Sequence, residues 1–218
     1  MNRALSLGLK LAGVAVVWCC WQFTASRSFS LFWSIAVVWG GTALGPLVSI
    51  AGRWLLDRRP IIERAAALSL LVHYLVMILL GCAIIVAFRF TQDYPIARIA
   101  FPKKISLPVV QITGALAVLT VVNLAIGGLG LPFAAVQSTK IATRWLYAGC
   151  RNPMGQYFLL CCIASAVWLQ SLHALLWATL WLAPAWILFV RIYEERELEI
   201  RFGESYLQYK RRTPFFGF

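Results

Sequence analysis

Two short polar segments carry the residue types best suited to chemistry, and a long apolar run separates them. The first is Arg151-Asn152-Pro153, which follows Tyr147 in a turn-rich stretch. The second is Glu194-Glu195, a pair of adjacent carboxylates. Residues 157–190 between them contain no Asp, Glu, Lys or Arg. Folded in half, this run predicts a helical hairpin at the short limit of membrane-spanning length, which would return both polar segments to one face.

The composition of the chain indicates a membrane protein. Hydrophobic residues make up 61% of the chain and charged residues 13%, which is unlike an ordinary soluble domain. Apolar runs long enough for one membrane helix each occur near 5–23, 29–51, 65–88 and 108–127. With the hairpin they predict an all-α, polytopic membrane helix bundle of about six spans with a cytoplasmic tail helix. We expect 1–127 to form the N-terminal transmembrane helices and 128–218 a cofactor-binding region.

The formal net charge of +12 has a simple interpretation in such a protein. If the N-terminus lies inside, most Lys and Arg residues fall in segments on the inner side, as the positive-inside rule requires. We therefore expect both termini to be cytoplasmic, in the inner membrane of a bacterium or in the endoplasmic reticulum of a eukaryote. The basic residues are expected to contact the lipid bilayer and its anionic headgroups, and no nucleic acid.

Neither the histidines nor the cysteines predict a metal or redox centre. His73 in the third span and His173 near the hairpin tip lie far apart and have no acidic partners nearby, which makes a poor metal site. We expect His73 to be a hydrogen-bonded interior residue. The 6 cysteines contain no CxxC spacing, so they are predicted to be free thiols that pack as small hydrophobic side chains.

The first polar segment has the features of an anion site at a helix N-terminus. Asn152 is predicted to be the N-cap and Pro153 the first helical residue. Free backbone N–H groups at such an end attract a carboxylate or phosphate, and Arg151 adds a bidentate fork. Alternatively, Asn152 is a simple cap and Arg151 binds a lipid phosphate. Upstream, Gly128 and Gly130 would either end the fourth span or let the backbone approach a cofactor closely.

The second polar segment continues into a helix whose spacing places its larger side chains on one face. Steps of three and four residues connect Glu195, Leu198, Phe202, Tyr206 and Tyr209. Gly203 predicts a break in this helix. Glu194 and Glu195 lie where the second arm leaves the membrane, and carboxylates there can accept two ribose hydroxyls or attract a cation. Glu197 and Glu199 are predicted instead to pair with arginines on a solvated surface.

Residues 143–216 resemble the C-terminal half of the isoprenylcysteine carboxyl methyltransferase and phospholipid methyltransferase superfamily. The front pattern of that superfamily is T-x-G-x-Y-x-x-x-R-H-P-x-Y. The corresponding residues here are Thr143, Trp145, Tyr147, Arg151, Asn152, Pro153 and Gly155. The back pattern is E-E-x-x-L-x-x-x-F-G-x-x-Y-x-x-Y followed by a proline. It is matched throughout by Glu194, Glu195, Leu198, Phe202, Gly203, Tyr206, Tyr209 and Pro214.

The resemblance implies an integral membrane methyltransferase that uses S-adenosylmethionine. The acceptor would be a lipidic or small amphipathic molecule with a carboxylate, amine or thiol. The implied cofactor-binding residues are Gly128, Gly130, Tyr147, Arg151, Asn152, Pro153, Glu194, Glu195 and Tyr206. A carboxylate acceptor requires no base, whereas an amine or thiol must lose a proton. The residues expected to take part in catalysis are Arg151, Glu194, Glu195 and Tyr157.

This chain departs from the front pattern at three positions, where Trp145 replaces glycine, Asn152 replaces histidine and Gly155 replaces tyrosine. The asparagine keeps the cap, but the loss of the tyrosine leaves cofactor packing or substrate choice open, and Tyr157 follows two residues later. Two alternatives remain. One is a sterol-reductase-like, NADPH-dependent membrane reductase, against which the Glu194-Glu195 pair argues. The other is a non-enzymatic membrane protein that retains the fold, which the departures favour.

Overall fold

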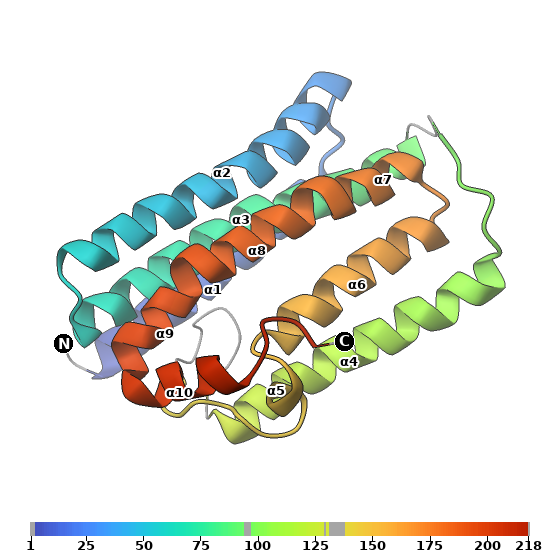
Figure 1. The fold of residues 1–218 in the computed structure, drawn as a ribbon. Coiled ribbons are helices and arrows are strands. Elements are labelled where there is room, and N and C mark those ends of the chain that lie inside the picture. Colours follow the sequence, from blue (N-terminus) through green and yellow to red (C-terminus); the bar gives the residue numbers. More distant parts are fainter. Residues whose placement is uncertain (1–2, 94–96, 129, 131–137, 218) are drawn as a thin grey trace.

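The computed structural model describes residues 3–93, 97–128, 130 and 138–217, and in these residues the fold is all-α (Figure 1). The four N-terminal helices are α1 (Arg3–Ser26), α2 (Leu31–Arg58), α3 (Ile62–Asp93) and α4 (Lys103–Gly127). The short α5 (Leu146–Gly149) precedes α6 (Pro153–Trp168), the first arm of the hairpin. The second arm and the tail comprise α7 (Leu172–Trp177), η2 (Ala178–Leu182), α8 (Ala183–Phe189), η3 (Val190–Glu194), α9 (Glu195–Phe202) and α10 (Glu204–Arg212).

Five helical segments among the described residues are long and apolar enough to cross a membrane, as expected of an integral membrane protein. They are Gly8–Ser26, Leu31–Arg58, Ile62–Phe90, Lys103–Gly127 and Leu172–Phe202. Large apolar side chains on the outer faces of α1 and α4 are exposed, and these faces suit contact with lipid. The prediction of about six spans is confirmed only in part, since five of the described helices are long enough and the sixth is shorter. The shorter helix is α6, whose 16 residues extend only about 24 Å.

The predicted hairpin is present, but its two arms are unequal. The turn lies at residues 169–171, where Gln170 has a φ of 58° and Ser171 caps α7 by accepting a hydrogen bond from the Ala174 N–H. The backbone N–H of Ile99, in the preceding loop, donates to the Gln170 carbonyl at 3.0 Å. The second arm does not end at residue 190, because helical structure continues to Phe202. The carboxylate pair is therefore part of a continuous helix.

Two π-helical turns interrupt the second arm, and the later one lies directly beside the carboxylate pair. In η3 (Val190–Glu194) the wider turn changes the direction in which the following side chains project. Such turns are frequent at functional sites. Here the turn ends at Glu194 and α9 starts at Glu195, so both carboxylates lie at the junction of two helical geometries.

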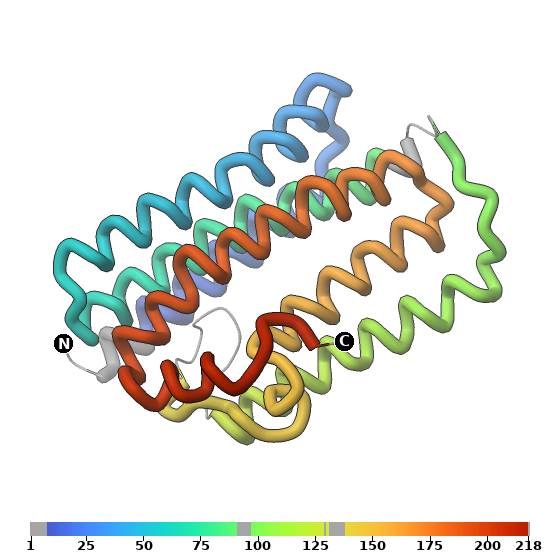
Figure 2. Tube along the Cα trace, in the orientation of Figure 1, coloured from blue at the N-terminus to red at the C-terminus, as the bar shows by residue number. Residues whose placement is uncertain are grey.

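The core lies between α2, α3 and the second arm, which run side by side in Figure 2. Tyr193 of η3 is completely buried there. It packs over Gly52 of α2, where an added Cβ would lie only 2.8 Å from the tyrosine ring. A glycine is needed at this position so that the two helices can approach each other. This contact ties η3, and the carboxylates that follow it, to the rigid part of the bundle.

One end of the bundle gathers the segments that the sequence singled out. The C-terminal end of α4, the start of α6, and all of α5, α9 and α10 lie together there (Figure 1). The predicted break is confirmed, since Gly203 has a φ of 55° and separates α9 from α10. α9 also packs against α3. The end of the bundle is therefore built from both 1–127 and 128–218.

Candidate functional site

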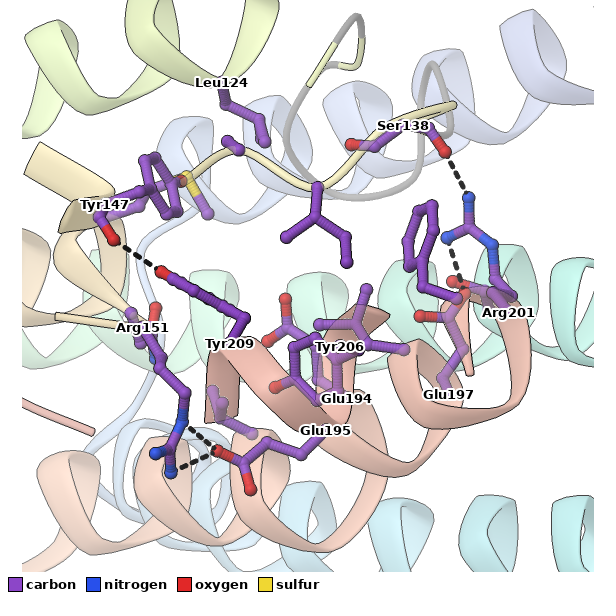
Figure 3. Close-up of a pocket in the computed structure, with 18 of the residues that line it drawn as sticks. Leu124, Ser138, Tyr147, Arg151, Glu194, Glu195, Glu197, Arg201, Tyr206 and Tyr209 are labelled. Carbon is purple, nitrogen blue, oxygen red and sulfur yellow. Dashed lines mark hydrogen bonds and ion pairs between the residues drawn. The ribbon is translucent and has the colours of Figure 1, made fainter. Parts of the chain in front are cut away.

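A polar cavity of about 120 Å³ lies at this end of the bundle. Its lining includes six of the predicted site residues, namely Tyr147, Arg151, Asn152, Glu194, Glu195 and Tyr206. Four other predicted residues, Gly128, Gly130, Pro153 and Tyr157, are not among its described lining residues. Figure 3 shows how α9, α10 and the segment from Ser138 to Tyr147 enclose the space. The hairpin thus brings the two polar segments together, as the sequence predicted.

The two glycines before the cavity serve the packing of their own loop in the described structure. An added Cβ on Gly130 would lie 2.8 Å from the backbone nitrogen of Ser138, and one on Gly128 would lie 3.3 Å from the Lys140 carbonyl oxygen. The close approach for which glycine is required is therefore to the chain itself. Leu129 and residues 131–137 lie outside the described residues. A role of Gly128 and Gly130 toward a cofactor stays a prediction.

The start of α6 has the predicted cap. The Asn152 side-chain oxygen accepts a hydrogen bond from the Gly155 N–H at 3.1 Å, and Pro153 occupies the first helical turn. Because that oxygen must be the acceptor, the Nδ2 group of Asn152 is a donor, and it is buried without a hydrogen-bond partner among the described residues. Asn152 lines the polar cavity. An unsatisfied buried donor of this kind marks a place for an acceptor atom of a ligand or water.

The glycine at position 155 is explained by its surroundings. The indole nitrogen of Trp186, from the second arm, and the Asn152 amide both occupy the space that a Cβ would need. The amide nitrogen would lie 2.7 Å from that Cβ. A tyrosine, as in the family pattern, does not fit here without rearrangement of both groups. Tyr157 is not among the described lining residues of the cavity, so a compensating role for it stays a prediction.

Arg151 is held by acceptors of the protein itself. Its Nε and Nη2 groups lie 3.0 and 2.8 Å from one carboxylate oxygen of Glu195. Its Nη1 group donates to the backbone carbonyls of Lys210 and Thr213 at 3.0 and 2.7 Å. The other Glu195 oxygen lies 2.6 Å from the Lys210 ammonium. Arg151 therefore fixes both a carboxylate of the cavity and the backbone of the C-terminal tail.

Glu194 differs from its neighbour because it has no hydrogen bond or salt bridge with any described residue. Its partly buried carboxylate faces the cavity between α9 and Tyr206, and no dashed line reaches it in Figure 3. A carboxylate in a largely enclosed site normally acquires a cation or several donors. The structure offers it none, so Glu194 is the group in this cavity most in need of an external partner.

The predicted pairing of Glu197 with an arginine is confirmed, but its predicted position on a solvated surface is wrong. Its residue is 2% exposed, and its carboxylate pairs with Arg201 at 2.8 Å. Arg201 also donates to the Ser138 carbonyl, which closes one side of the cavity (Figure 3). Burial arises because α3 and the segment at Ser138 cover this face of α9. Glu199 does form an expected pair, with Arg196 at 3.2 Å, and it also pairs with the Lys210 ammonium at 3.0 Å.

The three tyrosines of the cavity are hydrogen-bond donors. Burial, followed by the nearby Glu194 carboxylate, raises the pKa of Tyr147. Burial likewise raises the pKa of Tyr206 and of Tyr209, so all three phenols keep their protons at neutral pH. The Tyr209 hydroxyl donates to the Tyr147 carbonyl at 2.6 Å, and this hydrogen bond connects α10 to α5.

Sequence reasoning missed the residues that α3 contributes. Ser69 and His73 line the cavity together with Glu197 and Arg201. The spacing of Glu194, Glu197 and Arg201 by three and four residues could have revealed the last two, because it places them on one helical face. No sequence signal connects Ser69 or His73 with residues more than 100 positions away.

A second cavity, of about 380 Å³, lies deeper in the bundle and has an apolar lining. Side chains of α1, α3, α4 and α6 form it, and Trp186 borders it from the second arm. Val118 lies at its edge and is 62% exposed on the lipid-facing surface of α4. Met154 lines both cavities. A flexible methionine is thus the side chain that the polar and apolar spaces share.

Comparison of the chain with protein-family models, with curated proteins and with solved structures gives no match. The superfamily resemblance of residues 143–216 therefore stays a prediction from their motif residues.

Proposed function

We propose that this protein is an integral membrane methyltransferase that uses S-adenosylmethionine and acts on a lipophilic or amphipathic acceptor. The observation that carries the proposal is Glu194, an unpaired carboxylate in a cavity formed by both motif segments. S-adenosylmethionine supplies a methyl group bound to a sulfonium, which is displaced in line by the acceptor. The cation and the ribose hydroxyls of such a molecule are the partners that Glu194 lacks.

The other residues of the cavity divide the remaining tasks. The unsatisfied Nδ2 group of Asn152 is available to an oxygen atom of the cofactor. Tyr147 and Tyr206 offer ring surface and protonated phenols at the cavity wall. Arg151 acts mainly through Glu195, which it holds in place, and a ligand carboxylate would have to replace one of its present acceptors. Enclosure by these groups excludes water from the reacting atoms.

Binding requires the tail to move. A cavity of about 120 Å³ is smaller than the roughly 300–1,000 Å³ typical of small-molecule sites. Phe215 lines the cavity. This part of the tail is held by hydrogen bonds from the Arg151 and Asn152 N–H groups to the carbonyls of Pro214 and Phe215, at 2.8 and 3.3 Å. We propose that these contacts open to admit the cofactor and close again over it.

The apolar cavity supports a lipophilic acceptor. Its lining includes the exposed Val118, and it shares Met154 with the lining of the polar cavity. We propose that the hydrocarbon part of the acceptor occupies this space while its reactive group passes Met154 toward Glu194. Positioning of both reactants in one enclosed site provides most of the rate enhancement in a displacement of this kind.

Equilibrium binding to the purified protein in lipid nanodiscs tests the proposal. Radiolabelled S-adenosylmethionine should bind at one site per chain, and unlabelled S-adenosylhomocysteine should displace it. NADPH should not compete, which separates this function from that of a membrane reductase. Binding of NADPH alone, or of neither molecule, would refute the proposal.

A further inference from the structure

His73 of α3 is fixed in the wall of the polar cavity. Its residue is 8% exposed, and its ring lies edge-on to Phe189 at 5.2 Å and to Tyr193 at 6.1 Å between ring centres. Both aromatic residues belong to the second arm. These contacts hold the imidazole in one orientation, and His73 lines the cavity together with Glu194 and Glu197.

The hydrogen bond of the ring determines which nitrogen carries the proton. His73 Nδ1 lies 2.7 Å from the backbone carbonyl oxygen of Ser69. A carbonyl only accepts, so Nδ1 must donate, and in the neutral ring Nε2 is then the nitrogen with the free lone pair. No described residue makes a hydrogen bond to Nε2. The neutral imidazole of this cavity-lining residue therefore has an acceptor atom that no described residue uses.

Few other groups of the cavity can accept a proton. Arg151 and Lys210 neutralise Glu195, and Arg201 neutralises Glu197. The three phenols keep their protons, as described above. Tyr157, which was expected to take part in catalysis together with Arg151, Glu194 and Glu195, is not among the described lining residues. Among the described lining residues, Glu194 and His73 are the remaining side chains basic enough to accept a proton, and the proposed function assigns Glu194 to the cofactor.

We infer that His73 Nε2 accepts the proton that an amine, thiol or hydroxyl acceptor releases on methylation; this inference rests on the proposed function. As the bond between the methyl carbon and the acceptor heteroatom forms, the carbon–sulfur bond of the sulfonium donor breaks. The acceptor proton passes to Nε2, and the imidazolium later returns it to water. A base is needed only for a proton-bearing acceptor, so the site favours these acceptors over a carboxylate.

Chemical modification tests this role without any need for turnover. Diethyl pyrocarbonate acylates unprotonated imidazole nitrogens, and the chain has only 2 histidines, so mass spectrometry can follow each one. We expect modification of His73, and we expect saturating S-adenosylhomocysteine to slow it at least tenfold. His173, near the hairpin turn and outside the cavity lining, is the internal control and should react equally in both cases.

The outcomes of this experiment are distinct. If His73 stays unmodified in protein that binds S-adenosylhomocysteine, while His173 reacts, Nε2 does not face the cavity and the inference is wrong. If His73 reacts but no cofactor binds, the proposed function fails instead, and the inference fails with it as a step of methyl transfer.

A substitution provides the second test. The amide of His73→Asn can still donate to the Ser69 carbonyl but lacks an atom at the Nε2 position. Transfer of labelled methyl to hexadecylamine or hexadecanethiol in nanodiscs should fall by about 10²- to 10⁴-fold, the usual contribution of a general base. Affinity for S-adenosylmethionine should be unchanged, and His173→Asn should behave as wild type. Transfer to either acceptor at the wild-type rate by His73→Asn would overturn the inference.

Discussion

Replacement of Arg151 by alanine should destabilise the protein, because the guanidinium connects a buried carboxylate to the C-terminal tail. The substitution removes two contacts with Glu195, at 3.0 and 2.8 Å, and two hydrogen bonds to tail carbonyls. The side chains of Arg151 and Glu195 are 13% and 7% exposed. Water can therefore replace little of what is lost.

The expected loss of stability depends on the contacts that Glu195 keeps after Arg151 is replaced. Removal of one partner of a fully buried ion pair costs about 3–5 kcal/mol, because a charge is left uncompensated. Here Lys210 still reaches the other carboxylate oxygen at 2.6 Å, and its side chain is 32% exposed. The loss is then closer to that of charged hydrogen bonds, and we expect about 2–3 kcal/mol in the free energy of unfolding. Arg151→Lys should recover only part of this, since lysine lacks the planar fork.

Unfolding of the purified protein by sodium dodecyl sulfate in mixed micelles measures this change. Arg211→Ala is the matched control, because it breaks a salt bridge with Glu204 in which the side chains are 66% and 62% exposed. That variant should lose less than about 1 kcal/mol. A double-mutant cycle of Arg151→Ala with Glu195→Gln should give a coupling energy well above about 0.5 kcal/mol, the range of additivity for independent sites. Equal losses of unfolding free energy for Arg151→Ala and Arg211→Ala, with no coupling between Arg151 and Glu195, would refute the stabilising role of Arg151.

Two further predictions concern positions that the structure explains differently from the sequence. Glu197→Gln should destabilise the protein by about 1–3 kcal/mol, since Arg201 loses its carboxylate partner. Unfolding in detergent measures this change. An unchanged free energy of unfolding would support the prediction that Glu197 lies on a solvated surface. Gly155→Ala should cost about 1–3 kcal/mol by overpacking against Trp186, whereas Gly149→Ala should cost far less, because a Cβ there meets no atom within 4 Å. The same unfolding measurement compares the two, and equal costs would contradict the packing argument.

Local rules account for the parts of the site that the sequence predicted. The Asn152 cap and the Gly203 break depend on a few adjacent residues, so residue preferences alone suffice. The meeting of Arg151 with Glu195 follows from one further step, the folding of an uncharged run into a hairpin. The unequal lengths of the two hairpin arms could not be predicted from the sequence, because hydropathy shows where an apolar run ends and not where the helix ends. The second arm continues through its charged residues to Phe202.

The errors have a common physical origin in contacts between distant segments. Spacing by four residues predicts that Glu197 and Arg201 pair, but not that Ser69 of α3 lies over the pair and excludes solvent. Likewise, the sequence alone suggests that Gly155 lacks a functional side chain. In the structure, Trp186 of the second arm occupies the space that such a side chain would need. The base role that we infer for His73 depends on the same kind of contact, since the ring reaches the cavity through the packing of α3 against the second arm.

The affinity of Glu194→Gln for S-adenosylmethionine tests the central claim most directly. This carboxylate has no partner among the described residues, so its removal should leave the free energy of unfolding unchanged and affect only a bound ligand. Loss of charge-assisted hydrogen bonds worth about 1.5–3 kcal/mol predicts an affinity about 10- to 100-fold weaker in nanodiscs. Glu204→Gln, on the exposed surface of α10, should bind as wild type does. Equal affinities for wild type and both variants would contradict the placement of the cofactor beside Glu194.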